Sequence, residues 1–271
     1  MITYHGILDV PDHLCHTVAV WLCTHRRIHD IRPWQRAATP RSQAIMFLRW
    51  ARDASRIHVI ARDAQVSLAT AYRYIQEAIT VVASHQMSLQ QVIDQIKNHS
   101  SLWVMVDGTL IESDRVHRIN PATGHDLWYS GKHKCFGGNI QVLMDATGYP
   151  LWSSPVEPGS THDITAARQH VLGSLYALAG DGVATLADKG YIGAGIGVHT
   201  PVRGHRNQLD VNTRTRNRLV ADLRAPCERA NALLKTWKCL QHVSLDPNRI
   251  GDITAAMLVL THLKYPSPYS W

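Results

Sequence analysis

The stretch GVATLADKGY, residues 182–191, ends an apolar run on a carboxylate. Its apolar run from Val183 to Ala187 is typical of a short buried strand, and the run stops on Asp188. Open α/β folds place their ligands at the rim of the sheet, where such strands end. The stretch therefore predicts a sheet with a carboxylate at its functional rim. Its meaning depends on whether other acids reach the same rim.

The segments on either side of this strand predict an α/β domain. In chain order they are a strand at 102–106 that ends on Asp107, two strands joined by a turn at 135–156, a turn, N-cap and helix within 158–172, the strand at 183–187, helical residues from 214 to 239 with a break near Pro226, and an amphipathic helix at 250–260. Strand, hairpin, helix, strand and helix in this order predict a mixed sheet. We assign this α/β domain to residues 99–271.

Residues 1–98 predict a separate helical region that carries the positive charge. The chain has 28 lysines and arginines against 21 acids, a formal charge of +7. Residues 24–73 hold ten arginines and three aspartates, so this window alone accounts for the surplus. A concentrated positive charge favours association with a polyanion. The two ends of the chain are therefore expected to do different things.

Residues 41–83 resemble a helix-turn-helix. A helix at about 58–64 is followed by a turn, with Ser67 as the N-cap of a second helix and Ile75 facing inward. Thr70, Arg73 and Tyr74 are then expected to point outward. A recognition helix of this kind lies in the major groove of DNA, so we predict that Ser67, Thr70 and Arg73 contact DNA. An ordinary helical subdomain with solvated arginines would show the same spacing.

Three acids stand at positions where a fold of this kind could bring them together. Asp107 and Asp188 each end a strand, and Glu228 lies just inside a helix start. Carboxylates that lie close together resist joint ionisation unless cations neutralise them. Two Mg²⁺ ions would do so and could also drive phosphodiester displacement. Each acid also has a structural interpretation, as a turn former or as a partner of the helix dipole.

Other classes of protein fit the composition less well. The five cysteines are scattered and form no C-x-x-C pair, which is typical of reduced thiols in the cytoplasm. No apolar run approaches the ~18 residues of a membrane span, so we predict no membrane partner. The N-terminus lacks the pattern of a secretory signal. His25 and His29 lie near Cys15 and Cys23 in sequence, but the paired short spacings of a structural zinc site are missing.

Five segments together resemble bacterial insertion-sequence transposases of the DDE superfamily. They are VDGTLIESDR, YSGKHKCFGGNIQVLMD, PGSTHDITAAR, TLADKGYIGAGIGVHTPVR and RAPCERANALLKTWK. The greatest likeness is to the insertion-sequence group related to eukaryotic Harbinger elements. The resemblance implies an RNase H-like catalytic domain with Asp107, Asp188 and Glu228 as its metal-binding acids.

The same resemblance implies roles for further residues. Its R-x₃-E-x₆-K pattern maps onto Arg224, Glu228 and Lys235, whereas the tyrosine that precedes it in some relatives is Ala221 here. Arg224 would pair with an acid or a phosphate. Lys235 would contact a phosphate of the DNA end, or is a solvated helix lysine. The remaining expectations are Lys132 and Lys134 as residues that line the DNA path or cap a solvated edge, and Asp163 as the alternative second metal ligand.

What the resemblance implies about function is DNA transposition. The chain would bind the terminal inverted repeats of an insertion sequence and would cleave and transfer DNA strands with two Mg²⁺ or Mn²⁺ ions per site. Its partners would be double-stranded DNA of the repeats and of the target. A homodimer or higher assembly would hold two ends together, in the cytoplasm at the nucleoid. The alternatives are a DNA-binding regulator without catalysis and a domesticated nuclease without mobility.

Overall fold

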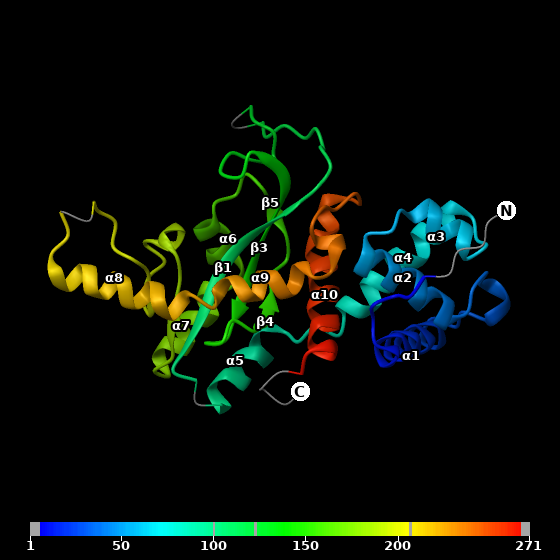
Figure 1. The fold of residues 1–271 in the computed structure, drawn as a ribbon, viewed down its shortest axis with the longest axis horizontal. Coiled ribbons are helices and arrows are strands. Elements are labelled where there is room, and N and C mark those ends of the chain that lie inside the picture. Colours follow the sequence, from blue (N-terminus) through cyan, green and yellow to red (C-terminus); the bar gives the residue numbers. More distant parts are fainter. Residues whose placement is uncertain (1–5, 100, 122–123, 206–207, 267–271) are drawn as a thin grey trace.

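The computed structural model describes residues 6–99, 101–121, 124–205 and 208–266. A central sheet carries helices on both faces, and helices α1 to α4 form a group at one end of the molecule (Figure 1). The fold is thus a mixed α/β fold, as predicted.

The sheet has the RNase H-like strand order. Its strands are β1 (Trp103–Glu112), β2 (Tyr129–Ser130), β3 (Cys135–Met144), β4 (Pro150–Ser153), β5 (Glu157–Pro158), β6 (Ala184–Leu186) and β7 (Val198–His199). β3 pairs antiparallel with β1 on one side and with β4 on the other, and β3 and β4 form the predicted hairpin. β6 then pairs with β1 and β7 pairs with β6, both in parallel.

The first strand is longer than the sequence predicted. We expected it to end on Asp107, but β1 continues to Glu112 because residues 105–112 pair with β3 along their whole length. Its parallel partner β6 is short and pairs only with Trp103 to Met105. Asp107 therefore lies in the middle of β1, at the point where β6 has ended.

Two helical layers cover the sheet because side chains alternate along its strands. Val104 and Val106 of β1 pack on one layer, and Met105 packs on the other. The first layer contains α5 (Leu89–Asn98), α6 (Asp163–His170) and α7 (Leu172–Gly180). The second contains α9 (Cys227–Lys235) and α10 (Ile250–Lys264). Odd-numbered residues of β1, Asp107 among them, belong to the face that α9 covers.

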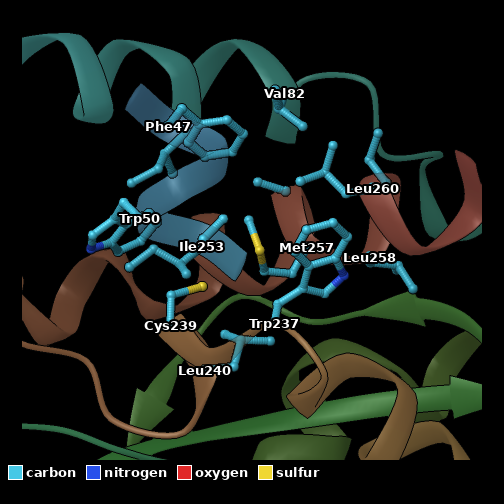
Figure 2. Packing of buried hydrophobic residues seen from close by; sticks show 14 of the residues in the cluster. Phe47, Trp50, Val82, Trp237, Cys239, Leu240, Ile253, Met257, Leu258 and Leu260 are labelled. Atoms are coloured by element: carbon cyan, nitrogen blue, oxygen red, sulfur yellow. The ribbon is translucent and has the colours of Figure 1, made fainter. Parts of the chain in front are cut away.

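Helix α10 is buried on most sides, which corrects the amphipathic helix that the sequence predicted. Ile253, Met257 and Leu260 are buried, and so are the polar Thr254 and Thr261. The reason is its position between α4 on one side and β4 and α9 on the other. Figure 2 shows Met257 and Ile253 of α10 among aromatic residues of α2 and Trp237. This cluster joins the helical group to the sheet.

The N-terminal helices are α1 (Asp12–Ile28), α2 (Pro40–Asp53), α3 (Ile57–Asp63) and α4 (Leu68–Ala83). The Ser67 side chain accepts a hydrogen bond from the Thr70 N–H and caps α4, as predicted. Gln65, in the turn before it, has a positive φ of 54°. Tyr74 does not point outward: it is 3% exposed, and its hydroxyl accepts a hydrogen bond from the Ala37 N–H. The segment before α2 folds over it, a contact that helical periodicity does not reveal.

Helix α8 (Val211–Arg224) lies at the end of the molecule opposite α1 to α4 (Figure 1). The short 3₁₀ turns are η1 (Pro33–Gln35), η2 (Lys189–Tyr191), η3 (Lys238–Leu240) and η4 (Pro247–Arg249). Among the described residues, every helix is too short or too polar to cross a bilayer.

Candidate active site

Strand register brings Asp107 and Asp188 to the same rim of the sheet. Met105 of β1 is the direct partner of Leu186 of β6. Each aspartate follows two residues later in its own strand direction, and the two strands run parallel. Residues two positions beyond a parallel pair stay on the same edge and face. The sheet thus places both carboxylates together, although they are far apart in sequence.

The chain turns sharply at Asp188. This residue is the N-cap of η2, and its Oδ1 accepts a hydrogen bond from the Gly190 N–H at 2.7 Å. A side chain at position 190 would meet the carboxylates, because a Cβ there would lie 2.9 Å from the Asp188 Oδ1 and 3.4 Å from the Asp163 Oδ2. Gly190 therefore lets the two acids approach the turn.

Asp107 faces one cation and one amide from the helices above it. Its Oδ1 lies 3.6 Å from the Arg224 guanidinium, and its Oδ2 accepts a hydrogen bond from the Asn231 amide at 3.3 Å. Burial raises the pKa of Asp107 to about 6, with Asp188 and Asp163 adding to the rise and Arg224 opposing it. The carboxylate is thus destabilised by the two neighbouring acids, which is the condition under which a bound cation stabilises a site.

Asp163 belongs to the same group of acids. It starts α6, and its Oδ1 packs so closely against Gly108, the residue after Asp107, that no side chain would fit there. That oxygen accepts a hydrogen bond from the Asn139 amide at 2.8 Å. Its Oδ2 lies 2.9 Å from the Lys132 Nζ. The alternative metal ligand from the sequence therefore lies between the backbones that carry Asp107 and Asp188.

A buried chain of hydrogen bonds leads to Asp163 and was missed from the sequence. The Tyr191 hydroxyl donates to the Gln141 Oε1 at 2.6 Å, and the Gln141 amide donates to the Asn139 Oδ1 at 3.0 Å. Tyr191, Gln141 and Asn139 are 0%, 0% and 5% exposed. Burial and the nearby aspartates raise the pKa of Tyr191 well above its ordinary value, so its hydroxyl stays a donor. In the sequence, this chain of hydrogen bonds could have been recognised from Asn139 and Gln141, two polar residues spaced by two in an otherwise apolar strand.

Four functional candidates share one face of the α8–α9 region. Arg224, Glu228, Asn231 and Lys235 follow one another at spacings of four, three and four residues, which is helical spacing along one side. Arg224 and Asn231 both contact Asp107, so the position of Glu228 between them faces the same rim. Asn231 was missed from the sequence, although this spacing could have identified it.

Glu228, the third predicted acid, lies in the first turn of α9 between Arg224 and Asn231, the two residues that contact Asp107. The Glu228 side chain is exposed. Within the part of the chain that the structure describes, no three acidic, histidine or cysteine side chains are arranged to hold a metal ion. Lys235 lies further along α9, where its charge acts on Cys135 at the start of β3. The structure therefore brings Asp107, Asp188, Asp163, Arg224 and Lys132 together and leaves Glu228 and Lys235 on the adjacent helix.

The donor set fits a hard divalent cation. The acids at the rim are the aspartates Asp107, Asp163 and Asp188, and carboxylate oxygens are ligands that Mg²⁺ and Mn²⁺ prefer. The amide of Asn231 lies beside Asp107, and among the described residues its buried Oδ1 has no hydrogen-bond partner. An unsatisfied buried oxygen costs about 1–3 kcal/mol, and a cation or its bound water would satisfy it.

The predicted DNA contacts lie in two places. Thr70 accepts hydrogen bonds from Ser67 and Arg73 at the start of α4, in the helical group. Lys132 and Lys134 lie exposed in the turn before β3, and only the former has an ion pair among the described residues, with Asp163. The first group is on a different part of the molecule from the carboxylates, and the second is beside them.

Comparisons with known proteins identify the region that holds this site. Residues 106–262, more than half of the chain, match the family described as DDE superfamily endonuclease. Among solved structures, the Mos1 transposase paired-end complex with left transposon end is similar, with 11% identity and a TM-score of 0.22. That likeness covers 82% of this chain and 76% of the other. No curated protein sequence matches this one.

Proposed function

Because this chain belongs to the DDE superfamily endonucleases, we propose that it is a DNA transposase that cleaves the ends of an insertion sequence and transfers them to target DNA. The observation that carries the proposal is the register of β1 and β6, which places Asp107 and Asp188 at one rim with Asp163 between them. Such a rim suits a phosphodiester, whose reaction needs cations between the acids and the substrate.

In this proposal Asp107, Asp188 and Glu228 hold two Mg²⁺ or Mn²⁺ ions. Such ions, when bound, activate an attacking oxygen and stabilise the leaving one in phosphodiester displacement. Glu228 would reach the rim by a change of its exposed side chain, since α9 already holds Asn231 and Arg224 against Asp107. Arg224 orients Asp107 and reduces the repulsion between the acids.

The remaining parts of the chain receive roles in DNA binding. We assign residues 1–98 to recognition of the terminal inverted repeats, with residues 41–83 as a helix-turn-helix and Ser67, Thr70 and Arg73 in contact with DNA. Residues 99–271 are assigned to catalysis, with Lys134 and Lys235 contacting phosphates. Transfer joins two element ends to one target, so the working form would be a homodimer or larger assembly at the nucleoid.

The test is cleavage of a DNA duplex that carries the inverted repeats flanking the coding region. Wild-type protein with Mg²⁺ is compared with Asp188→Asn and with the matched control Asp181→Asn. Asp181 lies before the other end of β6 and is half exposed in an ion pair with Lys97. We expect cleavage at the repeat ends by the wild type and the control, and binding without cleavage by Asp188→Asn.

Other results would change the assignment. Binding of the repeats without cleavage by any of the three proteins would favour a DNA-binding regulator. Cleavage without any transfer to a target duplex would favour a nuclease. Cleavage that survives Asp188→Asn would remove this residue from the metal site.

A further inference from the structure

The pair of Lys132 and Asp163 is unequal in its surroundings. The lysine side chain is 62% exposed, in the turn that precedes β3, whereas the aspartate side chain is 14% exposed. The Lys132 Nζ lies 2.9 Å from the Asp163 Oδ2. An exposed lysine is thus held at a defined place by an almost buried acid.

The acid is itself held by groups that cannot turn freely. The Gln141 Oε1 accepts from the Tyr191 hydroxyl, so its amide nitrogen is left to donate to the Asn139 Oδ1. The Asn139 amide nitrogen then donates to the Asp163 Oδ1 and to the Thr161 carbonyl oxygen. Each amide has one possible orientation, because reversing it would place two donors or two acceptors together. We call these three residues, Tyr191, Gln141 and Asn139, the relay.

The ammonium of Lys132 lies beside the carboxylates of the rim. Asp163, Asp188 and Asp107 all act on its charge, in that order of strength. Lys132 also lines a surface pocket together with Tyr129, Asn139 and Asp163. The lysine therefore lies at the border between the acids and an open space that a substrate could enter.

Stability alone does not account for this arrangement. An exposed lysine and carboxylate pair contributes about 0–1 kcal/mol, while three buried polar side chains must be fully satisfied to be tolerated in a core. A fixed ammonium, however, is a common phosphate-binding group. A rim of three aspartates repels a phosphodiester, and a positive charge held at its border offsets that repulsion.

We propose that Lys132 positions the phosphate of the DNA strand to be cleaved, and that Asp163 and the relay hold its ammonium in place for that contact. This inference rests on the proposed function, because it needs a DNA strand at the rim. In it Asp163 is a positioning residue that acts through Lys132. Tyr191, the far end of the relay, belongs to η2 and lies three residues after Asp188. The relay therefore connects the phosphate contact of Lys132 to the turn that carries Asp188.

The test is a double-mutant cycle on cleavage of the inverted-repeat duplex, with Lys132→Met, Asp163→Asn and the double variant. Each single variant should raise the KM for DNA about tenfold or more, the value of one charge-assisted hydrogen bond, with a smaller effect on kcat. The double variant should be no worse than either single one. Lys132→Arg should restore part of the affinity, and Tyr191→Phe should show a weaker effect of the same kind.

The matched control is Lys238→Met, an exposed lysine of η3 with no assigned role in DNA binding, which changes the net charge by the same amount. An equal KM for Lys132→Met and Lys238→Met would overturn the proposal. So would a loss of kcat in Asp163→Asn together with a higher Mg²⁺ requirement, additive to Lys132→Met, since Asp163 would then act directly. Thermal melting of every variant checks that the fold is retained.

A second measurement separates this inference from the proposed function. Binding of the same duplex in Mg²⁺ is followed by fluorescence anisotropy, which needs no cleavage. If the wild type binds but does not cleave, weaker binding by Lys132→Met than by Lys238→Met still supports the phosphate contact. Equal binding by the two variants removes it. If the wild type cleaves and Asp107→Asn does not, while Lys132→Met matches the wild type, only this inference fails.

Discussion

The helical group and the sheet rim use charge in opposite ways. In the helical group, arginines meet acids within the chain: Arg36 lies 2.5 Å from Glu77, and Arg49 lies 2.9 Å from Asp63. At the rim three aspartates converge, and the cations beside them are Arg224 at 3.6 Å and Lys132 at 2.9 Å. In the helical group, positive charges are paired with acids of the same region. At the rim, negative charges lie near one another.

The net charge of a sequence window does not by itself show that the window forms a positively charged surface. The window 24–73 has a surplus of seven positive charges, yet most of its arginines are engaged inside the protein. Arg26 is buried and donates to the Gln43 side chain, and Arg52 pairs with Asp9. Among the described residues, the exposed arginines of this window without an ion pair are Arg27, Arg56 and Arg73. A DNA surface in this region would therefore depend on few of the ten arginines.

The largest expected effect is at Asp107. We expect Asp107→Asn to reduce cleavage by about 1,000-fold or more, the loss of ~4 kcal/mol of transition-state stabilisation. The same change should stabilise the metal-free protein at pH 7.5, by at most about 3 kcal/mol. The pKa of Asp107 is about 6 in the fold against 3.8 as the ordinary value. The folded state thus holds the proton more tightly, and wild-type stability falls as the pH rises from about 4 to 6.

Urea unfolding of both proteins at pH 4 and pH 7.5, without divalent metal, measures this difference. The gain from Asp107→Asn should be larger at pH 7.5 than at pH 4. A variant that is less stable than wild type at pH 7.5 would mean that Arg224 and Asn231 outweigh the burial and repulsion at the rim.

The second effect tests the neutralised region. Glu77 joins the Arg36 ion pair and accepts a hydrogen bond from the buried Gln43 amide. We expect Glu77→Gln to destabilise the protein by about 2–3 kcal/mol, because it leaves a half-buried arginine without its partner. The control is Asp63→Asn, whose more exposed pairs should be worth less than about 1 kcal/mol. Thermal or urea unfolding measures both. Equal losses would mean that the two regions do not differ as described.

The third effect concerns the close approach of the acids. Gly108→Ala would place a Cβ against the Asp163 carboxylate and 3.0 Å from the Gln141 side-chain nitrogen. We expect a cleavage rate about tenfold lower and a loss of about 1–3 kcal/mol from overpacking. Gly173→Ala in α7, where a Cβ meets nothing within 4 Å, is the matched control and should be neutral or stabilising. Unchanged cleavage by Gly108→Ala would show that Asp163 can move without consequence.

The smallest effect is expected on the helical surface. Arg73→Ala should weaken DNA binding several-fold and reduce the salt dependence of binding by about one charge. The stability of this variant should change by less than about 0.5 kcal/mol, since Arg73 is exposed and, within the described part of the chain, its side chain hydrogen-bonds to Thr70 alone. Arg62→Ala, an exposed arginine paired with Asp63, serves as the control. Anisotropy at three salt concentrations measures the slope, and identical slopes would remove Arg73 from the DNA surface.

Local patterns in the sequence predicted the elements well. The β3–β4 hairpin, the cap at Ser67 and the acid after β6 all depend on neighbouring residues, so a single segment contains the information. Patterns failed where distant segments decide the environment. Helical periodicity predicted that Tyr74 of α4 points outward, but the segment before α2 covers it. Helix α10 reads as amphipathic, but elements on opposite sides bury it.

For the candidate site, the residue types and their order could be read from the sequence: two acids at strand positions and a third acid on a helix after them. Which of these acids meet depends on the way the chain folds. The pairing of Met105 with Leu186 sets Asp107 beside Asp188. The packing of α6 against β3 places Asp163 between them and gives it Asn139. Strand register and helix packing are long-range properties that depend on the whole core, and a pattern of neighbouring residues does not contain them.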